Sequence, residues 1–169
     1  GPGSFTGIRI SAAASQAIAL AAGARVLPVS SSLLLASAAR RQFAEQSGTD
    51  KNVPEGFQTV LRSRRNYAYL AAFSASGLPG EAGNLKLHAD DVLLEDSDLV
   101  EQPLPAGWAR VVEGQIDADA LGARAVEVKI TDLLALAEAA LAGGGGLPPE
   151  GAQPRYVSGD TPWKPQRGG

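Results

Sequence analysis

The chain opens with a glycine-rich loop that runs directly into a helix of small side chains. The candidate functional residues of this loop are Gly1, Gly3, Ser4, Phe5, Thr6 and Gly7. Glycine-rich turns before helices let backbone N–H groups approach an anion or another backbone segment closely. Such turns usually follow a β-strand, and no strand pattern precedes this one. Either the loop is a loose terminus, or its strand belongs to sequence outside these 169 residues.

The helix after the loop is the most informative element for function. We expect it over residues 6–22, with Thr6 as its N-cap and Gly23 after its last turn. Small side chains let a helix approach two neighbours closely, so two of its sides can be buried at once. One side is expected to cover the helix's own sheet, anchored by Ile8, Ile18 or Leu20. The other side is free for a partner, and the candidate interface residues are Ile8, Ala13, Gln16, Ala17 and Leu20. Composition alone slightly favours the alternative, a core helix with no partner.

Composition excludes several classes of protein. The chain has no cysteine, so disulfides, thiolate nucleophiles and Cys-based zinc sites are excluded. Its single histidine, His88, makes a His-based triad or a His-rich metal site improbable. The formal net charge of −3 argues against a dedicated nucleic-acid binder with a broad basic face. No apolar run is long enough for a membrane span and no signal peptide is visible, so we expect a cytoplasmic protein that makes no membrane contact.

The rest of the chain alternates strand and helix patterns, which predicts an α/β fold with two sub-domains. The expected elements are a short strand at 25–29, a helix at 30–46, two strands within 57–77 hinged near residues 65–66, a strand leading to a short helix at 85–96, a strand at 107–114, and a helix from about residue 131 to the glycines at 143–146. Thr131 or Asp132 is the expected cap of the last helix. The predicted units are residues 1–46 (loop, helix, strand, helix), a linker at 47–56, and 57–169, whose tail is expected to dock through Tyr156 and Trp163.

Three groups of residues are candidates for chemistry, and none of them has the pattern of an active site. The glycine loop lacks the Lys of a P-loop, and Ser4 has no evident His or Lys partner, so a structural turn is favoured. An acidic cluster is formed by Asp90, Asp91, Glu95, Asp96 and Asp98. It lacks the spacing of a calcium loop, and a solvated helix start is favoured; no metal site is predicted. Candidates for RNA contact are Arg62, Arg64 and Arg65, which lie among tyrosines. A sheet edge is the favoured alternative for these arginines.

Residues 1–42 resemble the signature region of the TsaB (YeaZ) family of bacterial tRNA-modification subunits. Members of that family carry a GPGSFTGxRIG loop, a small-residue helix ending near a glycine, and a VS(S/T)L step into the next helix. Here the loop reads GPGSFTGIRIS and the step reads VSSSL. Two weaker matches follow in order, RSRRNYAYLAAF at 62–73 and PRYVSGDTPWK at 154–164. Arg62 and Tyr67 stand where the family usually has Asp and Glu, and Val157 and Ser158 replace Leu and Arg.

The resemblance implies an actin-like, Hsp70-like ATPase fold of the ribonuclease H-like type, built from two related α/β sub-domains with five-stranded sheets. Family members begin with several strands and a helix before the glycine loop. By this resemblance the chain lacks those N-terminal elements, which accounts for a loop without its strand. It would keep the end of the first sub-domain and all of the second.

The resemblance also implies a function without catalysis. Proteins of this family support TsaD, the related catalytic subunit, and act with the ATPase TsaE. The complex transfers a threonylcarbamoyl group to the tRNA adenosine just 3′ of the anticodon. The helix at 6–22 is then expected to pack against TsaD or against a second copy in a homodimer, with tRNA contacted indirectly through the complex. No cofactor of its own is expected, and ATP or ADP would act at the level of the complex.

Two alternatives come from the enzyme class. One is a small ATPase or kinase that uses the glycine loop, which ATP turnover by the isolated chain would support. The other is an M22 glycoprotease-like protein, reached by the same resemblance. The chain has no HxxxH metal pair and no triad pattern, which argues against peptidase activity.

Overall fold

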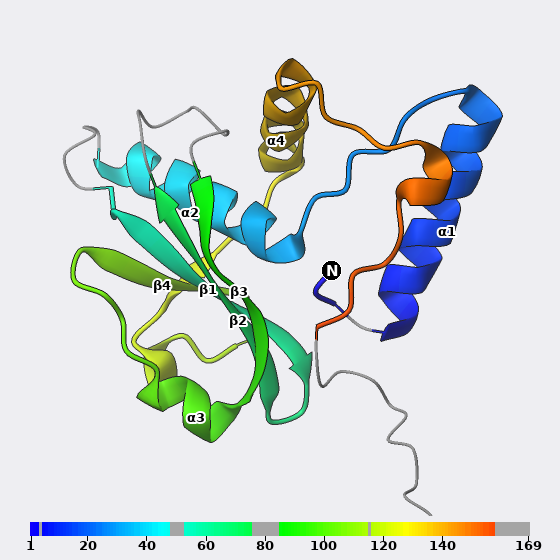
Figure 1. Ribbon diagram of the computed structural model, residues 1–169. Helices are drawn as coiled ribbons and strands as arrows, with labels where there is room; N and C mark the ends of the chain where they lie inside the picture. Colours follow the sequence, from blue (N-terminus) through cyan, green and yellow to red (C-terminus); the bar gives the residue numbers. More distant parts are fainter. Residues whose placement is uncertain (4, 48–52, 76–84, 115, 158–169) are drawn as a thin grey trace, which may run out of the picture.

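The computed structural model describes residues 1–3, 5–47, 53–75, 85–114 and 116–157. Its centre is a five-stranded sheet in the order β3-β2-β1-β4-β5 (Figure 1). The strands are β1 (Gly56–Arg64), β2 (Tyr67–Ala75), β3 (Leu85–Glu95), β4 (Trp108–Glu113) and β5 (Arg124–Val126). β2 pairs antiparallel with β1 and β3, whereas β4 pairs parallel with β1 and β5. The predicted α/β fold class and a mixed five-stranded sheet are confirmed.

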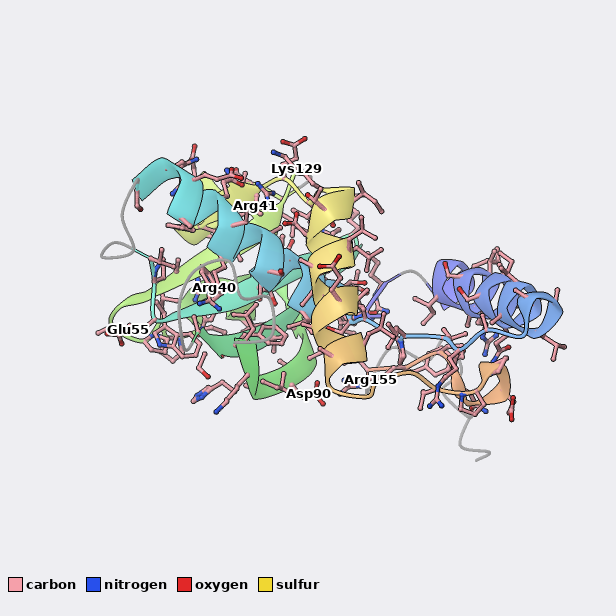
Figure 2. The ribbon with its side chains drawn as sticks, turned by 90° about the horizontal axis from the view of Figure 1, so that it is seen from above. Arg40, Arg41, Glu55, Asp90, Lys129 and Arg155 are labelled. Atoms are coloured by element: carbon pink, nitrogen blue, oxygen red, sulfur yellow. The ribbon has the colours of Figure 1, made fainter. Side chains whose placement is uncertain are left out.

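The helices occupy three places around this sheet. Their bounds are α1 (Phe5–Ala22), α2 (Ser31–Ser47), α3 (Asp96–Glu101) and α4 (Ile130–Ala142), with 3-10 turns η3 (Asp119–Leu121) and η4 (Pro149–Gly151). α2 crosses one face of the sheet, α3 lies on the opposite face, and α4 packs on α2 (Figure 1). α1 stands to the side of this body with η4 (Figures 1 and 2). None of the helices in the described ranges is long and apolar enough to cross a bilayer.

The alternation of side chains along the strands gives the sheet two cores. On one face Leu35 of α2 is fully buried against a cluster that includes Phe57 and Val111. On the other face Leu99 of α3 packs with Val60 and neighbouring strand residues. Because successive residues of a strand point to opposite faces, residues 57 and 60 of β1 contribute to different cores.

A buried arginine on the second face of the sheet, Arg110, forms hydrogen bonds to the elements that cover this face. Arg110 of β4 donates from Nε and Nη2 to Oε1 of Gln58 at 3.0 and 2.9 Å. It also donates to the carbonyls of Gln102 and Leu121, at 2.6 and 3.3 Å, at the ends of α3 and η3. Burial lowers the pKa of the guanidinium. These bonds tie α3 and η3 to the sheet.

Most of the expected elements are present. The two strands within 57–77 form a hairpin whose turn contains Asn66 at a φ of 65°, as predicted near residues 65–66. The left-handed conformation suits Asn better than most residues. The expected cap of the last helix is corrected: the helix begins at Ile130, and Oδ2 of Asp132 accepts from the backbone N–H of Lys129 at 2.8 Å. Asp132 therefore caps from inside the first turn.

One expected strand is wrong, and one observed strand was not expected. The strand at 25–29 is reduced to a single antiparallel bridge between Val26 and Leu147, so this segment has no regular sheet partner in the described part of the chain. β5 was not expected, because three residues carry too little pattern.

The predicted division into 1–46, 47–56 and 57–169 stays a prediction. However, α2 packs on the sheet of residues 56–126, so the buried core spans the expected boundary. Residues 48–52 lie outside the described part of the chain.

Candidate functional site

The outer side of α1 is an exposed apolar surface. Three large apolar side chains on this helix are mostly exposed: Ile10 at 64%, Ile18 at 71% and Leu20 at 75%. The exposed alanines beside them extend the surface. We define the outer face of α1 as Ile10, Ala13, Ala14, Ala17, Ile18, Leu20 and Ala21. All seven side chains are apolar, and contiguous exposed apolar surface of this kind marks interaction sites.

The opposite side of α1 is held by the chain just before the C-terminal tail. Ala19 is buried, and Nε2 of Gln16 donates to the carbonyl of Ala152 at 3.1 Å. Nε of Arg9 donates to the hydroxyl of Tyr156 at 2.7 Å, and its guanidinium lies 5.5 Å from the centre of that ring. The inner face is thereby anchored to residues 147–157 and not to the sheet.

This arrangement corrects part of the predicted interface. Ile18 and Leu20, expected as anchors on a sheet, are exposed. Gln16 and the half-buried Ile8 lie on the inner face, whereas Ala13, Ala17 and Leu20 lie on the outer one. The sequence grouped Gln16 with Ala13 and Ala17 on the partner face, and for Gln16 this is wrong, because an alanine-rich helix has no apolar stripe to show which side is covered.

The glycine loop approaches other backbone segments closely. The carbonyl of Gly1 accepts from the N–H of Ser31 at 3.1 Å. A Cβ on Gly1 would lie 2.8 Å from the carbonyl oxygen of Arg155, and one on Gly3 would lie 3.2 Å from Ile8. The loop is followed at once by α1, in which Phe5, Thr6 and Gly7 form the first turn. Ser4 lies outside the described residues.

The three candidate RNA-contacting arginines do not form one surface. Nη1 of Arg62 donates to both carboxylate oxygens of Asp96, at 2.6 and 2.9 Å, and so ties β1 to α3. Arg64 stacks over the ring of Tyr67 at 4.4 Å, and Arg65 is exposed in the hairpin turn. A register shift between residues 62 and 64 separates the first arginine from the other two.

The acidic cluster is also divided among separate partners. Asp90 pairs with Arg155 (Figure 2). Oδ1 of Asp91 accepts from the hydroxyl of Ser32 at 2.5 Å. Burial raises the pKa of Asp91, although the bond from Ser32 opposes this. Glu95 accepts from the Tyr67 hydroxyl at 2.7 Å. Within the described ranges no three His, Asp or Glu side chains converge as metal ligands would.

The comparisons with known proteins show which solved structures share this fold. No family model and no curated protein matches the chain. A solved structure of an uncharacterized protein with similarity to peptidase YeaZ from Pseudomonas aeruginosa matches 93% of this chain and 70% of its own, with a TM-score of 0.68 and 27% identity. A second structure, YeaZ from Pseudomonas aeruginosa, matches 92% of this chain and 71% of its own, with a TM-score of 0.65 and 24% identity. The resemblance to YeaZ (TsaB) proteins and the actin-like fold predicted from the sequence are confirmed.

Proposed function

We propose that this chain, whose fold is that of YeaZ, is a TsaB-type subunit without catalytic activity of its own. In this proposal it docks on TsaD through the outer face of α1. It supports TsaD, together with TsaE, in transferring a threonylcarbamoyl group to the tRNA adenosine 3′ of the anticodon. The single observation that carries the proposal is the exposed, uncharged outer face of α1, on a chain whose structural neighbours are YeaZ proteins.

The small side chains on this face favour a partner helix. Ala13 and Ala17 lie four residues apart, so they occupy the same side of α1. Without long side chains between them, two helices can approach closely and bury the flanking Ile10 and Leu20. Burying each large apolar side chain is favourable by roughly 1.5–3 kcal/mol. A second copy of this chain is the alternative partner for the same surface.

A subunit without catalysis is favoured by the chemistry of the described residues. His88 is the chain's one histidine, and its ring packs edge-on against Trp108 at 5.2 Å. One structural neighbour is described as similar to a peptidase. In a His-based triad or metal pair the ring of His88 would contact a nucleophile or a metal, whereas here it contacts the ring of Trp108. No cofactor is proposed for the chain itself, and ATP or ADP would bind at the level of the complex.

The proposal is tested by mixing the purified chain with TsaD and TsaE from the same organism. Co-elution of the chain with TsaD in gel filtration is expected. When an activated threonylcarbamoyl donor and ATP are supplied, the mixture should modify tRNA only when all three proteins are present. The isolated chain should release no phosphate from ATP, since no Lys accompanies its glycine loop. Steady-state turnover that Gly3→Val abolishes would instead favour the ATPase alternative.

A further inference from the structure

The sheet face that carries α3 ends in a row of side chains around the indole of Trp108. The strand register places four residues side by side on β4, β1, β2 and β3, namely Trp108, Gly56, Ser74 and Lys86. Because paired residues point to the same face of a sheet, this row lies on the side of α3, opposite α2 (Figure 1). Lys86 is exposed, and Trp108 and Ser74 are half-buried. Part of the row is therefore open to a ligand.

The indole of Trp108 lies over the backbone of Gly56. A Cβ at Gly56 would come within 2.4–2.6 Å of three ring atoms, so one face of the indole rests on the strand. The exposed part of this half-buried side chain is then its other face and its edge. His88, an exposed residue of β3, packs against the indole with the ring centres 5.2 Å apart and the ring planes at 66°. The two rings form a corner that can hold one further planar ring.

The charged groups beside the two rings favour a nucleobase as that planar ring. Lys86 lies two residues before His88 on β3, and its ammonium forms no ion pair with any residue in the described part of the chain. This ammonium is available to a phosphate, and the imidazole N–H of His88 can donate a hydrogen bond. Aromatic side chains on an exposed sheet, with a cation beside them, are the usual means of holding unpaired bases of single-stranded RNA.

From these observations we infer that Trp108, His88 and Lys86 bind an unpaired base of a single-stranded RNA. The base stacks on the outer face of the indole, beside the imidazole, and Lys86 binds the adjacent phosphate. A site with one free cation fits one or two nucleotides, which agrees with a chain of net charge −3 that has no broad basic face. The site uses no residue of the outer face of α1, so it is separate from the proposed contact with TsaD.

The probe is a cytidine RNA of about eight nucleotides, a length within the usual range for single-strand sites. Cytosine is chosen because its amino group can donate to a carboxylate, and the exposed Glu55 precedes Gly56 (Figure 2). The full chain carries Trp163→Phe, which leaves Trp108 as its only tryptophan. Stacking should quench the fluorescence of Trp108. An abasic oligonucleotide of the same length and charge should not quench it, and free cytidine monophosphate should bind more weakly than the RNA.

Two variants at exposed positions separate stacking from charge. His88→Ala should weaken RNA binding roughly fivefold or more, because one wall of the stacking site is lost. Lys86→Ala should weaken binding and reduce the slope of log K against log salt by about 0.7, the value for one phosphate contact on a single strand. The matched control is Arg65→Ala, an exposed cation at the other end of β1, which should leave both quantities unchanged.

Four results would overturn the inference. One is the absence of quenching up to the solubility limit of the RNA. Another is equal quenching by the abasic oligonucleotide, which would show that no base stacks on Trp108. The third is binding of cytidine monophosphate as tightly as the RNA, since the site would then take a free nucleotide. The fourth is an effect of Arg65→Ala as large as that of Lys86→Ala, which would move RNA binding to the hairpin turn. None of these measurements includes TsaD, so they leave the proposed function to its own test.

Discussion

Arg41 of α2 and Asp132 of α4 form a two-point ion pair that joins the two helices. Nε of Arg41 lies 2.7 Å from Oδ1 of Asp132, and Nη2 lies 3.2 Å from Oδ2. Nη2 also donates to the carbonyl of Glu127, just before α4, at 3.1 Å. Figure 2 shows Arg41 on α2 near Lys129, whose N–H Asp132 caps at the start of α4. The pair raises the pKa of Arg41.

The carboxylate of Asp132 should be important for stability. It is 3% exposed, whereas the Arg41 side chain is 23% exposed, so water weakens the pair only in part. Asp132→Ala should lower the free energy of unfolding by about 2–3 kcal/mol, through loss of the pair and of the helix cap. Glu45→Ala is the control: this carboxylate contacts the same guanidinium but is 56% exposed, so about 0.5 kcal/mol or less is expected. Urea unfolding of both variants measures the difference, and equal losses would contradict it.

Asp91 should make stability fall as pH rises. Burial raises its pKa in the folded protein above the ordinary value of 3.8, so the folded state holds this proton more tightly than the unfolded state does. The stabilising contribution is fully present below pH 3.8 and is lost as pH rises through the folded pKa. Asp91→Asn should remove this component from a pH series of unfolding free energies. Ser32→Ala should enlarge this pH-dependent component, because the hydrogen bond from Ser32 favours ionised Asp91 and its loss raises the pKa further. An unchanged dependence of the unfolding free energy on pH in both variants would disprove the assignment.

Gly56 is required by the indole of Trp108, which lies across the start of β1. A Cβ at this position would come within 2.4–2.6 Å of three ring atoms of Trp108. Gly56→Ala should therefore cost about 1–3 kcal/mol of stability by displacing the ring. Gly114→Ala, where nothing lies within 4 Å of the added methyl group, should be neutral or slightly stabilising. The difference should vanish in a Trp108→Ala background, which a double-mutant cycle by thermal unfolding can measure.

α1 should open more readily than the body of the molecule. Ala19 is the one buried residue among its described side chains, whereas Val60 and Val111 of the sheet are fully buried. Native-state hydrogen exchange should show the amides of Ile10 to Leu20 exchanging much faster than those of β1 and β4. α2, which the sequence grouped with α1 in the unit of residues 1–46, should instead exchange at the slow rate of the sheet, because Leu35 lies in the core on the sheet. Equal protection of α1 and β1 in a monomeric sample would contradict this.

Sequence reasoning recovered the elements that carry their own local signals. The β1–β2 hairpin, α2, α3, β4 and α4 follow from apolar patterning, turn residues and glycines, and the family resemblance supplied the fold. The errors arose where tertiary contacts decide. The segment at 25–29 reads as a strand, but among the described residues only Val26 of this segment has a bridging partner. The placement of α2 on the sheet depends on its packing against Phe57, which no local pattern shows.

The candidate site was predicted less well than the fold. The small-residue composition of α1 indicated a surface that could pack closely, but not which side was already occupied. That side is fixed by Tyr156 and Ala152, which lie far along the chain from their partners Arg9 and Gln16. The tail was expected to dock through Tyr156, and this residue does contact α1; Trp163 lies outside the described residues.

The most direct test of the account is the binding of TsaD to the Ala17→Glu variant. Ala17 is exposed, so the substitution should leave thermal stability nearly unchanged, within about 0.5 kcal/mol. In a helix–helix contact the new carboxylate would be buried without a partner, and affinity should fall at least about tenfold, or ~1.4 kcal/mol. Glu138→Lys, an exposed change on α4, should alter neither property. If titration calorimetry shows that Ala17→Glu binds TsaD as tightly as the unmodified chain, the outer face of α1 is not the docking surface.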